Sequence, residues 1–219
     1  MEFIKNPKAI EDKSMSLIDP FIGDMPLTEE EKTVYSRMIH ASGDVDYGHL
    51  IAAGEGAVRA GIEALNGGCS IYCDVEMVRT GINKNALRQL GGQTFCRVSD
   101  PEIVKSAAEK GIARSLEAMH SFGTDLNGSV IAIGNAPTAL FEAVRMTLEE
   151  GIRPALIIGI PVGFVGAAES KEYLIHHSPV PYITVRGTKG GSSIAASAVN
   201  AMMYNLVRRS GMLYVEGRK

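Results

Sequence analysis

Short apolar segments alternate with longer, mixed segments over most of this chain. The apolar segments are rich in Ile, Val and other residues that favour strands, and they carry few charges, which is typical of strands buried on both faces of a sheet. They are residues 69–75 (CSIYCDV), 93–99 (QTFCRVS), 129–135 (SVIAIGN), 154–160 (PALIIGI) and 181–187 (PYITVRG). Between them we expect helices that begin near Pro101, Pro137, Ala168 and Gly191.

Two more helices are expected before the first of these strands. Thr28 followed by Glu31 forms the pattern of a capping box, which predicts a helix running towards Ile39. Residues 57–68 (AVRAGIEALNGG) predict a second helix that stops at its glycine pair. Strands that alternate with helices predict an α/β fold, with a mainly parallel sheet and helices on both faces. Since no linker or internal repeat interrupts the pattern, we expect one domain over residues 1–219.

The loops that follow the predicted strands are rich in polar and small residues. In a parallel sheet, ligands usually bind beyond the carboxyl ends of the strands, where these loops lead into helices. The loops are residues 74–81 (DVEMVRTG), 99–102 (SDPE), 134–139 (GNAPTA), 161–171 (PVGFVGAAESK) and 186–193 (RGTKGGSS). We therefore expect the functional site along this edge of the sheet.

Several of these loops are suited to binding anions. Residues 190–193 (GGSS) open the last predicted helix, whose free N–H groups and dipole favour a carboxylate or phosphate, with Arg186 and Lys189 adding charge. Asn135 and Thr138, at the start of another helix, suggest a second such site, and Lys171 lies in a third loop. Each feature alone is more often ordinary capping, but together they indicate a large, multiply anionic ligand.

Composition and charge exclude several classes of protein. A net charge of -3 gives no general attraction to nucleic acid or to an anionic membrane. No apolar run approaches the roughly 20 residues that span a bilayer, and the charged N-terminal stretch does not resemble a signal peptide, so we expect a cytoplasmic protein. The odd count of three cysteines suits a reducing compartment, and we interpret Cys69, Cys73 and Cys96 as small core residues.

Familiar catalytic motifs do not fit. Gly54 and Gly56 begin a dinucleotide-binding pattern, but Arg59 occupies the third glycine position and no strand clearly precedes them. The chain has no G-x-S-x-G nucleophile motif and no Walker spacing. His176 and His177 are adjacent, whereas metal-chelating pairs on a helix are usually four apart, so a solvated helix end is the simpler interpretation.

Motifs in order along nearly the whole chain resemble the precorrin-8X methylmutases. They are residues 37–44 (RMIHASGD), 74–78 (DVEMV), 134–140 (GNAPTAL), 161–165 (PVGFV), 169–171 (ESK), 190–192 (GGS) and 200–201 (NA). The resemblance implies a Rossmann-like α/β fold and a homodimer with the site near the subunit interface. It also implies an isomerase without added cofactor, which moves one methyl group between neighbouring carbons of ring C of a tetrapyrrole. The product is a corrin, hydrogenobyrinic or cobyrinic acid.

The resemblance assigns the catalytic acid to His40, and the position of this residue agrees with that role. His40 lies near the carboxyl end of a capped helix, where the dipole favours imidazolium, and Asp44 is close enough in sequence to orient it. Taken without the motif, a helix-terminal histidine that satisfies a carbonyl is the simpler interpretation. The candidate residues for substrate binding are Ser16, Arg37, Asp44, Thr80, Arg114, Asn135, Lys171, Arg186, Lys189, Gly190, Gly191 and Ser192.

Other interpretations remain beside these assignments. Arg114 could simply belong to a solvated helix face, and Met15, Met38 and Met77 fit core packing better than contact with a macrocycle. Thr188 stands where relatives often carry Arg. Lys189 is therefore the candidate for the contact that this Arg would make with a substrate carboxylate. A non-catalytic tetrapyrrole carrier is the main alternative function, and a nucleotide-dependent oxidoreductase is a more remote one. Any cobalt would arrive within the substrate, so no protein metal site is expected.

Overall fold

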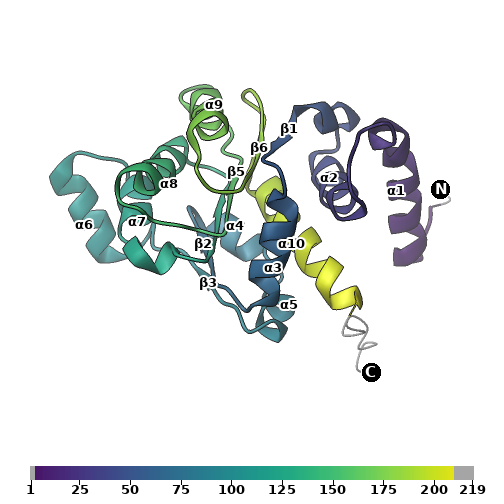
Figure 1. Ribbon diagram of the computed structural model, residues 1–219, viewed down its shortest axis with the longest axis horizontal. Coiled ribbons are helices and arrows are strands. Elements are labelled where there is room, and N and C mark those ends of the chain that lie inside the picture. The colour runs from purple at the N-terminus through teal and green to yellow at the C-terminus, as the bar shows by residue number, and fades with distance from the viewer. Residues whose placement is uncertain (1–2, 210–219) are drawn as a thin grey trace.

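A six-stranded sheet forms the centre of the computed structural model, which describes residues 3–209 (Figure 1). The strand order is β1-β6-β5-β4-β2-β3, and every neighbouring pair is parallel except β1 with β6. The predicted α/β fold with a mainly parallel sheet is confirmed. The strands are β1 (Ile51–Ala53), β2 (Ile71–Cys73), β3 (Thr94–Phe95), β4 (Val130–Ile133), β5 (Leu156–Gly159) and β6 (Tyr182–Val185).

Helices cover both faces of the sheet, as expected. Figure 1 shows α7, α8 and α9 on one side of the sheet and α3 and α10 on the other, with α2 and then α1 stacked outside α10. The α-helices are α1 (Pro7–Ile22), α2 (Glu29–Ser42), α3 (Ala57–Asn66), α4 (Glu76–Gly81), α5 (Lys84–Gln89), α6 (Pro101–Lys110), α7 (Arg114–His120), α8 (Pro137–Glu149), α9 (Ala167–His177) and α10 (Ser192–Arg209). Two 3-10 helices, η1 (Val45–Leu50) and η2 (Gly123–Leu126), complete the set. None of the helices within the described residues is long and apolar enough to cross a membrane.

The strands are apolar on both faces because each face is covered by helices. In β4, Val130 and Ala132 belong to the hydrophobic cluster on the α3 and α10 side, whereas Ile131 and Ile133 belong to the cluster on the α8 side. This alternation follows from the two-residue period of a strand. Cys73 is fully buried, and Cys69 and Cys96 are half-buried against the first cluster, so the three free thiols pack as core residues.

All of the predicted strands and interior helices are present, but several further elements were not predicted. These are α1, β1, α4, α5, the separate helix α7, η1 and η2. The polar stretch before Thr28 contains helix α1, which begins with Asn6 as N-cap and Pro7 in the first turn. Strand β1 directly precedes Gly54, so the expectation that no strand precedes these glycines is wrong. Strand β1 escaped prediction because three residues are too short to show a period. Arg59 still occupies the third glycine position of the dinucleotide pattern.

Candidate active site

The antiparallel direction of β1 places the end of α2 beside the loops of the parallel strands. Ile51, the first residue of β1, pairs with Val185, the last residue of β6. The Arg186 N–H also donates to the Leu50 carbonyl at 2.8 Å, which continues this pairing by one residue. The segment that leads from α2 into β1 therefore lies at the edge where the parallel strands end. This arrangement brings residues from the first fifth of the chain to the loops that the sequence identifies.

His40 lies in the last turn of α2 and is exposed. The capping box between Thr28 and Glu31 starts this helix, as predicted. Gly43 ends it in the left-handed conformation (φ 67°), and its N–H donates to the carbonyls of Ile39 and His40 at 3.1 and 3.3 Å. The helix therefore stops three residues after the imidazole, which remains near the negative end of the helix dipole.

Asp44 links this helix end to the loop at residues 186–191, which we call the glycine loop. The Asp44 carboxylate accepts hydrogen bonds from the Lys189 ammonium and, at 3.0 Å, from the Asp46 N–H. The bond from Lys189 is the main reason that the pKa of Asp44 lies below its ordinary value. The hydrogen bonds of the Asp44 carboxylate are thus with Lys189 and Asp46, and its role in orienting His40 stays a prediction.

The glycine loop is held closely against the end of β5. The Gly191 N–H donates to the Ile160 carbonyl at 2.9 Å, and the Gly163 N–H donates to the Thr188 carbonyl at 3.1 Å. A β-carbon at Gly190 would lie 2.5 Å from the Ile160 carbonyl oxygen and 2.6 Å from that of Pro161, so only glycine fits there. Ser192 then begins α10, as the sequence predicts to within one residue. The start of α10 is therefore fixed at the sheet edge.

Asp74 organises the neighbouring loop after β4. Its buried carboxylate accepts the N–H groups of Gly134, Asn135 and Ala136 at 3.1, 2.9 and 2.7 Å. Burial raises the pKa of Asp74, and these three hydrogen bonds oppose that rise. An internal carboxylate thus binds the N–H groups of the three residues that precede α8, and they are not free for a ligand. The second anion site expected from Asn135 and Thr138 stays a prediction. The role of Asp74 was missed, although Asp74 directly follows β2 in the sequence.

The loop after β4 also lies against the start of α10. A β-carbon at Gly134 would come within 2.6 Å of the Ser192 α-carbon, so the two loops are in direct contact. Asn135, the residue after Gly134, is exposed. Thr80 is exposed in α4, the helix that follows β2. Arg114 is exposed at the first position of α7, and its neighbour Ser115 shares a 2.9 Å hydrogen bond with Thr138 in the first turn of α8. Asn135, Thr80 and Arg114 therefore lie on elements that meet at this edge.

Other predicted residues have protein partners. Arg186 donates to both carboxylate oxygens of Glu172 in α9 at 2.8 Å, and this ion pair is exposed. Arg37, half-buried, pairs with Glu11 of α1 and lies 6.0 Å from the Tyr204 ring centroid. Lys171, expected in a loop, instead lies in α9, where it is fully buried and bonded to the glycine loop. The exposed Ser16 hydroxyl donates to the Lys13 carbonyl within α1, and His176 and His177 end α9 in solvent as expected.

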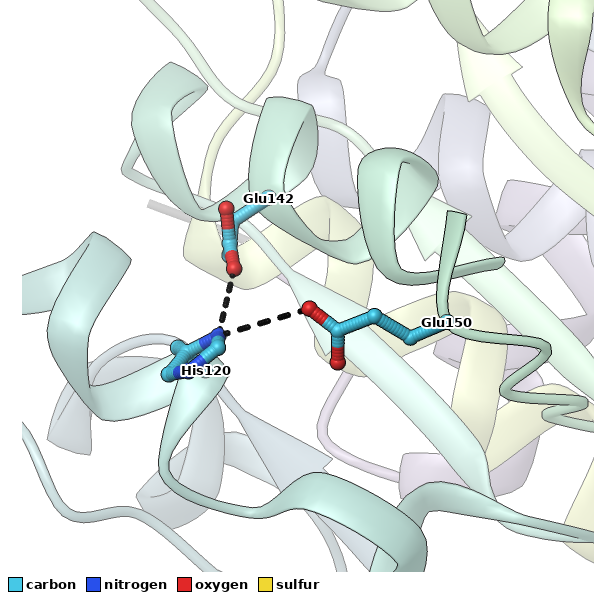
Figure 2. A group of neighbouring side chains, drawn as sticks. All are labelled: His120, Glu142 and Glu150. Carbon is cyan, nitrogen blue, oxygen red and sulfur yellow. Dashed lines mark hydrogen bonds and ion pairs between the residues drawn. The ribbon is translucent and has the colours of Figure 1, made fainter. Parts of the chain in front are cut away.

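His120, Glu142 and Glu150 form the one group of metal-ligand side chains in the described part of the chain (Figure 2). His120 Nδ1 lies 2.8 Å from Glu142 and 4.0 Å from Glu150. Arg145 donates to each of these carboxylates at 2.6 Å and so occupies the oxygens that a cation would need. Burial alone would raise the pKa of Glu142, but the bonds from Arg145 and His120 lower it. We interpret the group as an ion-pair network that joins α7 to α8.

The fold and the edge define an α/β protein whose loops present helix N–H groups, cationic side chains and an exposed histidine. Comparisons with known proteins identify its family. A family model described as precorrin-8X methylmutase matches residues 9–205. A cobalt-precorrin-8 methylmutase of Leptospira interrogans is 43% identical over 202 residues, covering 89% of this chain and 91% of the relative. A precorrin-8X methylmutase of Pseudomonas aeruginosa is 41% identical over 205 residues, covering 92% and 97%.

A solved structure agrees with the sequence relatives. The precorrin-8X methylmutase of Thermus thermophilus superposes with a TM-score of 0.81 at 34% identity, covering 94% of this chain and 100% of that one. The chain belongs to the precorrin-8X methylmutase family, the isomerases of corrin biosynthesis.

Proposed function

We propose that this protein moves a methyl group within ring C of precorrin-8X or cobalt-precorrin-8, with His40 as the acid. The shift is intramolecular: the bond from the methyl group to one ring carbon breaks as the bond to its neighbour forms. No redox partner or external nucleophile is needed. What the protein must supply is a rigid site and a proton donor that draws electron density from the macrocycle.

The observation that carries this proposal is the place of His40. It is exposed at the carboxyl end of α2, three residues before the αL glycine, and Asp44 joins this helix end to the glycine loop through Lys189. The imidazole lies near the negative end of the helix dipole, and histidine is the side chain best suited to donate a proton near neutral pH. One ion pair thus joins the helix end that carries His40 to the glycine loop, which supports the proposed roles of both.

We propose that the carboxylates of the substrate bind along the sheet edge. The N–H groups of Gly190 and Ser192 at the start of α10 suit one carboxylate, whereas the Gly191 N–H is bound to the Ile160 carbonyl. The exposed ammonium of Lys189, which also pairs with Asp44, adds positive charge there. Arg186 and Arg37 would have to exchange carboxylates, from Glu172 and Glu11, to join them. The remaining candidates for ion pairs or hydrogen bonds are Arg114, Ser16, Thr80 and Asn135.

Exposed apolar side chains at the same edge suit the flat macrocycle. Met77 in the first turn of α4 and Phe164 and Val165 in the loop after β5 are all strongly exposed. Met38, in contrast, is fully buried and Met15 packs against the core, which agrees with the structural interpretation of those two residues. Large exposed apolar groups beside cationic ones are what a conjugated ring with carboxylate arms requires.

We also propose a cytoplasmic homodimer. Ile10, Leu17 and Phe21 are exposed on α1 at spacings of seven and four residues, so they share one face of that helix. An apolar stripe of this kind on an outer helix favours contact with a second copy of the chain. Light scattering of the purified protein should give twice the chain mass, and a monomer at micromolar concentration would contradict the proposal.

The test of function is turnover of both substrate forms. The purified protein is mixed with precorrin-8X and with cobalt-precorrin-8, and absorbance and product mass are followed. A spectral change at unchanged mass is expected for the isomerase, and the faster form identifies the natural substrate. Binding of both forms without conversion would instead indicate a carrier and would remove the proposed role of His40.

A further inference from the structure

Lys171 is a buried cation beneath the glycine loop. It lies in the second turn of α9, and its exposed fraction is 0%. Its ammonium donates to the Lys189 carbonyl at 2.6 Å. Within residues 3–209, no carboxylate forms an ion pair with it. The lysine is therefore held by a neutral backbone oxygen and not by a counter-ion.

This arrangement is costly for folding. Removing an ammonium from water without an opposite charge disfavours the charged form, and burial lowers the pKa of Lys171 to about 8. Glu172, the next residue along α9, opposes this effect, but its carboxylate is shared with Arg186 and His176. A buried apolar side chain of similar length would avoid the cost, so the ammonium is expected to contribute something other than stability.

The bond from Lys171 connects three parts of the site through one residue. The Lys189 carbonyl accepts the hydrogen bond from Lys171, and the Lys189 ammonium donates to Asp44. Asp44 lies just after α2, the helix that carries His40. Backbone bonds at Thr188 and Gly191 join the glycine loop to the segment after β5, and Arg186 at its start bonds to Leu50 and Glu172. Lys171 is thus the side chain that fixes the middle of the loop from α9.

We propose that Lys171 is a positioning residue, which holds the glycine loop so that the start of α10 and the Lys189 ammonium face the substrate. In this role Lys171 acts through the Lys189 carbonyl and does not touch the substrate. The inference rests on the proposed function for the identity of the ligand, but the contact itself is independent of it.

The experiment compares Lys171→Met with Lys110→Met, a matched change at a lysine that pairs with Glu117 between α6 and α7. Hydrogen exchange is measured by mass spectrometry on peptides covering residues 160–166 and 186–195, together with steady-state turnover of precorrin-8X. In Lys171→Met, loss of the buried bond should speed exchange in these peptides by about tenfold, with peptides of α6 and β4 unchanged. KM should rise by about tenfold with a smaller change in kcat.

A purely structural role would lower the active fraction and hence kcat, but it would not raise KM. Unchanged exchange of the glycine loop in Lys171→Met, or the same change in Lys110→Met, would overturn the proposal. Faster exchange with normal KM would also overturn it, because the loop would then not need to be held for binding. If the wild-type protein shows no turnover, the proposed function fails, while the exchange measurement still decides whether Lys171 holds the loop.

Discussion

At the scale of single residues, Asp74 shows how a buried carboxylate can build a loop. It takes three backbone N–H groups that would otherwise lie near the start of α8 without partners. Asp74→Ala should lower the free energy of unfolding by about 3 kcal/mol, because buried donors lose their acceptor. Urea unfolding measures the change, with Asp74→Asn, which keeps one acceptor oxygen, expected to lose less. Equal stability of wild type and Asp74→Ala would contradict this description of the loop.

The candidate residues could be predicted only in part. His40 is located by the capping box and the glycine that follows it, both of which are local signals. The partners of Lys171, Arg186 and Lys189 could not be predicted, because each contact joins segments distant in sequence. The same reason hid the role of Asp74, whose donors are about 60 residues further along the chain, at Gly134 and beyond. The residue types in the loops indicated that the site lies at the carboxyl ends of the strands. Only the packing of the loops shows which atom each side chain contacts.

At the scale of elements, the end of α2 depends on the left-handed Gly43. Its φ of 67° disfavours any side chain, although a β-carbon would meet no neighbour within 4 Å. Gly43→Ala should therefore cost about 1 kcal/mol of stability, and it should also reduce turnover by disturbing the helix end that carries His40. Thermal unfolding and turnover are measured together.

Gly151 provides the matched control for this prediction. It follows the C-cap of α8 with a φ of 72°, and a β-carbon there also has open space. Gly151→Ala should lower stability by a similar amount but leave turnover unchanged, because it lies at the end of α8 that is opposite the candidate site. Equal effects of the two substitutions on turnover would show that the end of α2 has no special role.

The elements themselves were predictable where the pattern was long enough. The buried strands β2, β4, β5 and β6 follow from their apolar runs, and Pro101 and Pro137 mark helix starts at the correct residues. The expected buried strand at residues 93–99 is instead the two-residue edge strand β3, in which Phe95 is exposed. Strand β1 was not predictable, since Ile51, Ala52 and Ala53 are defined by their pairing with β6. This short strand nevertheless decides the architecture of the site, because its antiparallel direction brings α2 to the sheet edge.

At the scale of the whole molecule, stability should depend on pH through Lys171. Its pKa is lowered to about 8 in the folded protein from 10.5, so between these values the unfolded chain binds more protons than the folded one. The free energy of unfolding should therefore rise with pH over this window, relative to that of Lys171→Met. Chemical denaturation of both proteins from pH 7 to pH 10.5 measures the difference.

Other charged groups near Lys171 could also change the stability of the protein between pH 8 and pH 10.5. Glu172 on the same helix pairs with Arg186, Asp44 beyond the loop pairs with Lys189, and the α8 groups Glu142 and Arg145 bond to each other. These groups are present in both proteins, so their contributions cancel in the comparison. Parallel pH profiles of the wild type and Lys171→Met would contradict the burial of a charged ammonium at this position.

The central claim is that His40 is the acid of a methyl shift, and turnover of the His40→Ala protein tests it most directly. His49, an exposed histidine in the neighbouring η1, provides the control His49→Ala. We predict that His40→Ala keeps its fold and binds the corrin product but does not convert precorrin-8X or its cobalt form, while His49→Ala converts substrate normally. Near-normal turnover by His40→Ala would contradict the assignment and would require another proton donor at this edge of the sheet.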